Sequence, residues 1–125
     1  MEPVVKYVKL VDGLLSYNST YNQSFSAVVQ KIDEKTTAHT VVSSDVGMYL
    51  RINSSEAVNV TIGDFECEIG ACVTFEQSGA GVITLVASGV TLNALDDGLS
   101  SMGQFSVIQI IKVDELTFTV VGGTV

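Results

Sequence analysis

The chain contains no Trp, one Pro and one His among its 125 residues. The lone His39 has no Cys neighbour, and no Ser or Cys stands in a nucleophile motif. Nothing therefore combines a nucleophile, a general base and an orienting group. A glycosidase built on paired carboxylates is the remaining catalytic alternative, but the chain has no Trp to stack on sugar rings. We predict no enzyme and no cofactor.

Long apolar runs and helical periodicity are absent as well. No run approaches the roughly 20 residues of a membrane helix, and no stretch keeps the apolar period of an amphipathic helix. The start, Met1-Glu2-Pro3, lacks the basic residues and apolar centre of a secretory signal. We expect that the chain is made in the cytoplasm and does not insert into a membrane. The alternative is a mature form from which a signal has been removed.

Basic residues are scarce, with six Lys and Arg against 14 Asp and Glu and a net charge of −8. Residues 1–35 contain equal numbers of basic and acidic side chains, so residues 36–125 carry the whole net charge. Such a surface repels phosphate backbones. We therefore predict no nucleic-acid partner and regard the charge as a source of solubility.

The chain has only two Cys, Cys67 and Cys72. In one extended strand their Cα atoms would lie about 17 Å apart, whereas a disulfide requires roughly 5.5 Å. Only a tight reversal at Ile69-Gly70 could join them. Two free thiols are the expectation, although the sequence leaves their redox state open.

What the chain has in abundance is β-branched side chains, since Val, Ile and Thr make up 39 of its residues. From Phe25 onward, strand signals recur about every 8–12 residues, as in a β-sandwich or barrel. Residues 48–52, 58–62 and 71–76 alternate and predict inward side chains, among them Leu50, Ile62 and Phe75. The glycines of the stretch 77–113 predict two hairpins and a following strand.

Residues 1–24 differ from the rest, because mixed apolar and Lys residues give way to a polar stretch with two tyrosines. We predict an N-terminal arm at 1–24 and one β domain at 25–125, with an ordinary surface loop as the alternative for the polar stretch. The candidate arm contacts are Val5, Tyr7, Leu10, Tyr17 and Tyr21.

Two strands are apolar on both faces, at 82–87 and 105–113, and both faces of such strands must be covered. Contact with other copies of the chain would cover them, and a β-bulge near Val107-Ile108 is the competing explanation. The predicted oligomer interface consists of Val82, Leu85, Val86, Ile108, Ile110 and Ile111.

The acidic residues Asp64, Glu66 and Glu68 alternate, with Glu76 as a neighbour opposite them. Such a row could hold a divalent cation, but more often it is a solvated strand face. Asp96-Asp97-Gly98 is more typical of a turn than of a metal loop. We predict no metal site.

About the last 75 residues contain an ordered series of short motifs, namely Ile69-Gly70, Val73-Thr74-Phe75, Gln77-Ser78-Gly79-Ala80-Gly81, Gly89-Val90-Thr91-Leu92-Asn93, Gly103-Gln104-Phe105-Ser106, Ile111-Lys112-Val113 and the final Phe118 to Gly122. In this series the chain resembles modules of tailed-bacteriophage virions, namely head-fibre, capsid decoration and tail-fibre domains. The resemblance implies an all-β fold, an antiparallel, jelly-roll-like β-sandwich, together with trimers and no enzymatic activity.

These expectations lead to a virion protein that decorates or cements the capsid surface as a homotrimer. Its partners would be itself and the major capsid protein or another virion protein, bound by an arm that adds a strand to a sheet edge. The alternative is a receptor- or carbohydrate-binding fibre tip that contacts a host surface glycan. Its receptor-facing residues would be Ser78, Gly79, Ala80, Asp96, Asp97 and Ser100.

Overall fold

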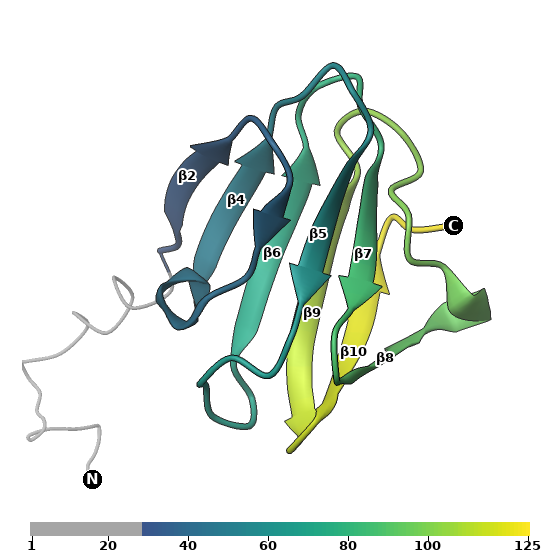
Figure 1. Cartoon of the computed structure of the whole chain (residues 1–125). Coiled ribbons are helices and arrows are strands. Elements are labelled where there is room, and N and C mark those ends of the chain that lie inside the picture. Colours follow the sequence, from purple (N-terminus) through teal and green to yellow (C-terminus); the bar gives the residue numbers. More distant parts are fainter. Residues whose placement is uncertain (1–28) are drawn as a thin grey trace, which may run out of the picture.

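The computed structural model describes residues 29–125, which form two β-sheets (Figure 1). The predicted arm, with Val5, Tyr7, Leu10, Tyr17 and Tyr21, lies outside the described residues. The larger sheet has the order β2-β4-β6-β9-β10-β8, and the smaller has the order β3-β5-β7. The strands are β2 (Lys31–Lys35), β3 (His39–Thr40), β4 (Met48–Ile52), β5 (Val58–Ile62), β6 (Cys72–Gln77), β7 (Ile83–Ala87), β8 (Thr91–Ala94), β9 (Val107–Asp114) and β10 (Thr117–Gly122).

The structure is all-β, as predicted, and its only helical elements among residues 29–125 are the short 3-10 turns η2 (Ser43–Asp45) and η3 (Leu95–Asp97). None of the elements in that part of the chain is a helix able to cross a membrane.

The chain winds in coils, because successive strands from β2 to β7 alternate between the two sheets. Each strand therefore pairs in parallel with the strand one coil later, as β2 does with β4 and β5 with β7. Five of the seven strand pairs among residues 29–125 are parallel, so the prediction of antiparallel sheets was wrong for them. The physical reason is that alternation fixes which side chains face inward but not the direction of the neighbouring strand.

The predicted hairpins in 77–113 were also wrong. The glycines at 79–81 connect β6 in the larger sheet to β7 in the smaller one, rather than joining two paired strands. The chain closes with antiparallel pairs, β6 with β9 and β9 with β10.

The core lies between the sheets, and Figure 1 shows the smaller sheet in front of the larger. The predicted inward alternation is confirmed for Leu50, Ile52, Val60, Ile62, Val73 and Phe75, all of which are buried. Phe118 of β10 is buried too and stacks on Phe65 from the β5–β6 connection, with ring centroids 5.6 Å apart. Side chains from both sheets thus form one core, the normal arrangement for a domain of this size.

Two glycines allow successive coils to touch at one corner of the molecule. The Gly81 N–H donates to the Ser54 carbonyl at 2.8 Å, and a Cβ at position 81 would overlap the Glu56 carbonyl oxygen. A Cβ at Gly79 would lie 2.5 Å from the carbonyl oxygen of Ser54. Because neither position has room for a side chain, the 79–81 segment lies directly on the turn that follows β4.

This close approach gives a prediction for stability. Replacing Gly81→Ala should lower the free energy of unfolding by about 2 kcal/mol or more, because backbone must shift to relieve the overlap. Chemical denaturation monitored by circular dichroism measures the change.

The matched control is Gly103→Ala, since a Cβ there meets no atom within 4 Å and the residue is not in the left-handed region. That variant should change stability by less than about 1 kcal/mol. Equal effects of the two substitutions would contradict the close coil contact.

Candidate functional site

The predicted row of carboxylates does not form one strand face. Asp64, Glu66 and Glu68 lie in the β5–β6 connection, whereas Glu76 lies on β6. Within residues 29–125, no group of three or more His, Cys, Asp or Glu side chains is arranged to hold a metal ion. The strand β5 ends at Ile62, so the alternation of Asp64, Glu66 and Glu68 falls in a connection, where all three side chains are exposed.

Glu76 instead binds two neighbours on the outer face of the larger sheet. The Tyr49 hydroxyl and the Arg51 Nε donate to Glu76 Oε1 at 3.0 and 2.9 Å. Glu76 is only 9% exposed, so these bonds compensate a carboxylate that has little contact with water. Desolvation, followed by the hydrogen bond to Glu76, raises the pKa of Tyr49 above its ordinary value.

Three of the six residues predicted to form the oligomer interface cannot contact another copy of the chain. Leu85, Ile108 and Ile110 are buried in the protein's own core and are unavailable to another copy. Val82, Val86 and Ile111 keep some exposure.

In the sequence, the apolar residues of 105–113 switch from one strand face to the other near Val107. The structure explains this switch, because Phe105 has a positive φ of 73° and lies before β9, so it does not belong to the alternation of that strand. Residues 107–112 then alternate regularly between the outer and inner faces. The proposed bulge near Val107-Ile108 is therefore also wrong, and the register shift in the β9–β10 pair lies between Thr117 and Phe118.

The predicted receptor-facing residues do not form one surface. Gly79 is buried and Ser78 is half-buried, while Ala80 is exposed. Ser100 is half-buried and shares a hydrogen bond with Thr84 at 3.0 Å.

Asp96 and Asp97 of η3 are exposed, and both have a left-handed φ of 55°. Their element follows β8, whose strand lies at one side of the molecule in Figure 1. Of the six residues, only Ala80, Asp96 and Asp97 are exposed; Ala80 lies in the β6–β7 connection, whereas the two Asp residues lie in η3.

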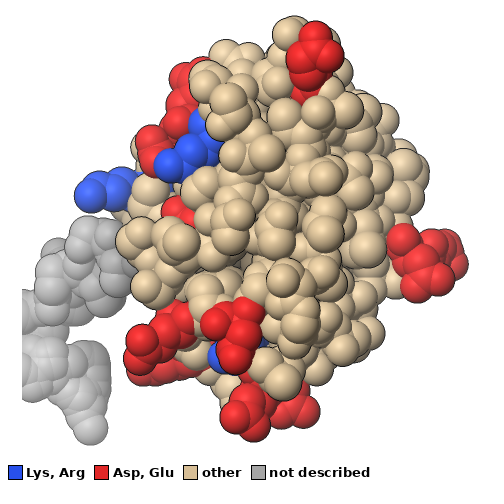
Figure 2. All heavy atoms as spheres, in the orientation of Figure 1, with Lys and Arg blue, Asp and Glu red and all other residues tan. Residues whose placement is uncertain are grey.

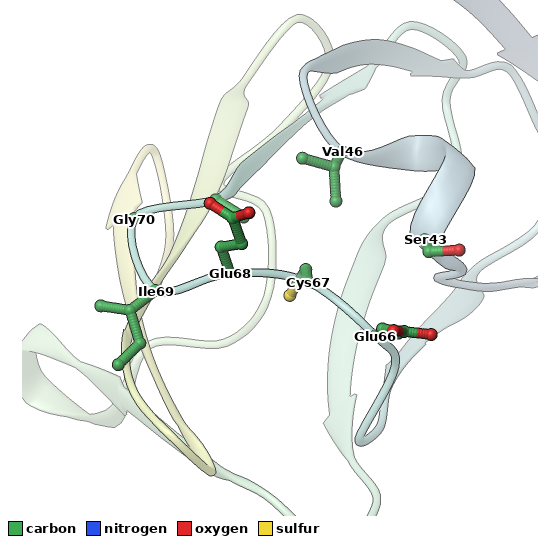
Figure 3. Close-up of a pocket in the computed structure, with 8 residues that line it drawn as sticks. Ser43, Val46, Glu66, Cys67, Glu68, Ile69 and Gly70 are labelled. Atoms are coloured by element: carbon green, nitrogen blue, oxygen red, sulfur yellow. The ribbon is translucent and has the colours of Figure 1, made fainter.

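The described domain has a cavity of about 550 Å³ that is open to solvent (Figure 3). One wall is the turn around η2, and the other is the end of the β5–β6 connection. The lining residues are Ser43, Val46, Glu66, Cys67, Glu68, Ile69, Gly70 and Ala71. Sequence reasoning missed this site, although Val46 and Ile69 gave a signal as apolar residues in turn segments.

Hydrogen bonds hold the wall formed by the β5–β6 connection. Ala71 N–H donates to the Glu68 carbonyl at 3.0 Å, and Gly70, at φ 98°, makes the reversal possible. The Lys112 ammonium donates to the Cys67 carbonyl at 3.1 Å and is itself only 8% exposed.

The reversal that could have joined the two Cys is therefore present, yet Cys67 and Cys72 are both free, as predicted. Burial raises the pKa of the Cys67 thiol.

The η2 wall is held by Asp45, a buried carboxylate. Its Oδ2 lies 2.8 Å from His39 Nε2 and accepts the Val42 N–H at 3.0 Å. The Gly47 N–H donates to the Cys72 carbonyl at 2.7 Å, which attaches this turn to the start of β6. Both walls are thus fixed to the sheets.

The end of the molecule that carries this cavity is acidic. Figure 2 shows carboxylates gathered at the lower end of the view, where Figure 1 places the β5–β6 connection and the β9–β10 turn. These segments contain Asp64, Glu66, Glu68, Asp114 and Glu115. Lys112 remains a cation beside Cys67, but the five carboxylates outnumber it. The cavity therefore lies in a negative field that favours a cationic ligand.

Comparison with known proteins finds no family model, curated protein or solved structure that matches the chain.

The Tyr49–Glu76 contact predicts how stability depends on pH. Because the folded state raises the pKa of Tyr49, this residue contributes stability below its ordinary pKa of about 10, and the contribution is lost as pH rises through the higher folded value. The wild-type protein should therefore lose more free energy of unfolding than the Tyr49→Phe variant between about pH 9 and about pH 12, the range in which a Tyr side chain titrates. Urea denaturation at several pH values measures this, and identical pH profiles would contradict it.

Proposed function

We propose that this chain is a non-enzymatic structural protein of a bacteriophage virion that decorates or cements the capsid surface as a homotrimer. The proposal builds on the resemblance of the later segments to virion modules and on the distribution of charge along the chain.

The observation that carries the proposal is this uneven charge. Residues 1–28 contain Lys6 and Lys9 against Glu2 and Asp12, so the whole net charge of −8 belongs to residues 29–125. An acidic body repels other acidic bodies and stays hydrated, whereas a segment without net charge is not repelled by a partner surface. This division would suit a protein with an outward body and a docking segment.

The docking contacts would be the arm residues Val5, Tyr7, Leu10, Tyr17 and Tyr21, added as a strand to a capsid-protein sheet. Among residues 29–125, the strand β2 lies at one edge of the larger sheet. It reads Lys-Ile-Asp-Glu-Lys, and charged side chains on an edge strand disfavour pairing with other sheets. The charged residues of β2 would therefore keep the sheets of neighbouring copies from pairing along this edge while the arm binds the capsid.

For the trimer, Val82, Val86 and Ile111 remain the proposed contacts, because they are the predicted residues that keep some exposure. The proposal does not require the jelly-roll strand order that the resemblance implies. Two sheets with the observed coil winding can also present an acidic surface to solvent, as the decoration role requires.

The alternative function is a receptor- or carbohydrate-binding fibre tip. It is favoured by three exposed apolar side chains in the segment 95–105, namely Leu95, Met102 and Phe105. Phe105 is 63% exposed, and an exposed aromatic ring is suited to stacking on a sugar.

The two functions are separated by a pair of variants of the full chain. Light scattering should give a solution mass of about three times 13.2 kDa for the wild type and for both variants. In a pelleting assay with capsids that lack this protein, Tyr7→Asp/Leu10→Asp should reduce binding by at least about tenfold, the effect of losing about 1.4 kcal/mol. Phe105→Ser should bind capsids as the wild type does.

Binding to glycan arrays or host cells that is lost in Phe105→Ser would instead establish the alternative function. A monomeric wild type that binds no capsid would contradict the decoration role.

A further inference from the structure

We propose that the cavity between Ser43–Val46 and Glu66–Ala71 is the docking site, in the free protein, for residues 4–11 of the same chain. This inference is independent of the virion role, because it concerns the protein without any partner.

The cavity combines apolar contact surface with negative charge. Val46 is 36% exposed and Ile69 is 66% exposed, which leaves apolar surface at the two walls. Figure 3 shows the Val46 side chain directed toward the connection that carries Cys67 and Glu68, with the Glu66 carboxylate on the side of Ser43. A suitable occupant therefore has aliphatic side chains and at least one cation.

Residues 4–11 have this chemistry. They read Val-Val-Lys-Tyr-Val-Lys-Leu-Val, with two Lys, no acidic residue and otherwise only aliphatic or aromatic side chains. Three of the four basic side chains among residues 29–125 already have partners, since Lys35 contacts Asp33, Arg51 contacts Glu76 and Lys112 contacts the Cys67 carbonyl. The fourth, Lys31, lies in the charged strand β2, whereas Lys6 and Lys9 stand among aliphatic residues that match the apolar walls. Lys6 and Lys9 are therefore the cations that best complement Glu66 and Glu68.

The place where the described chain begins makes an intramolecular contact favourable. The Gln30 side-chain amide donates to the Gly47 carbonyl at 3.4 Å, and Gly47 directly follows Val46 in the cavity wall. Residues 12–29 lie between the segment and Gln30, and a chain of that length can span up to about 60 Å. Closing such a loop within one chain costs little additional entropy per residue.

Zero-length carbodiimide coupling of the full-length protein tests the contact, because it joins a Lys amine to a carboxylate only when the two touch. Mass spectrometry of the digested monomer should show Lys6 or Lys9 joined to Glu66 or Glu68. The yield should be the same over a tenfold range of protein concentration and should fall when salt is added.

A pair of surface variants provides the control. Val46→Ser/Ile69→Ser should lower the yield of these cross-links at least threefold, because the apolar part of the contact is lost. Val107→Ser/Val121→Ser changes two exposed apolar residues on the outer face of the larger sheet and should leave the yield unchanged.

Three results would overturn the proposal. One is coupling of Lys6 and Lys9 to Glu56 or Asp96 as often as to the cavity carboxylates, and another is an equal loss of yield in both surface variants. The third is cross-links that occur only between two chains, which would show docking in a neighbouring copy. Capsid binding is not involved in this assay, so its failure leaves the proposed virion role to be judged separately.

Discussion

The close approach of the 79–81 segment to the turn after β4 is the constraint on which the rest of the structure depends. Gly81 has no space for a Cβ against Glu56, and its N–H binds the Ser54 carbonyl. This contact places one coil directly on the next, so that β6 lies beside β4 and β7 lies beside β5. The inward residues of these four strands then meet in one core. The Gly-Ala-Gly segment therefore allows one coil to pack on the next. Its backbone is held against the turn after β4, which does not fit the predicted role of a receptor-facing loop.

The sequence predicted the inward faces better than the connections between strands. Leu50, Ile62 and Phe75 were predicted from alternation alone and are buried, because a period of two is imposed by the pleat whatever the neighbouring strand does. Strand direction was predicted wrongly, since glycine-rich turns look alike whether they join paired strands or lead from one sheet to the other. The apolar residues Leu85, Ile108 and Ile110 were assigned to an interface because strands that are apolar on both faces do not reveal which face the second sheet covers.

Of the properties of the candidate site, only its negative charge could be predicted from the sequence. The acidity of residues 36–125 was evident from composition, but the cavity depends on contacts between distant segments, such as Lys112 with the Cys67 carbonyl and Gly47 with the Cys72 carbonyl. No local pattern encodes those pairs. Glu76 illustrates the same limit, because it belonged to a predicted row of carboxylates and in the structure binds Tyr49 and Arg51 from the adjacent strand.

The coil winding is the central claim, because the core, the cavity and the remaining exposed surface all follow from it. Cross-linking of Cys pairs in β5 and β7, in a Cys67→Ser/Cys72→Ser background, tests it most directly. Parallel pairing places Asn59 opposite Thr84 and Thr61 opposite Val86, so Cys introduced at either pair should form a disulfide on mild oxidation. The exchanged pairs, Asn59 with Val86 and Thr61 with Thr84, would be about 8 Å apart and should not react. Rapid disulfide formation by the exchanged pairs alone would show antiparallel strands and contradict the account.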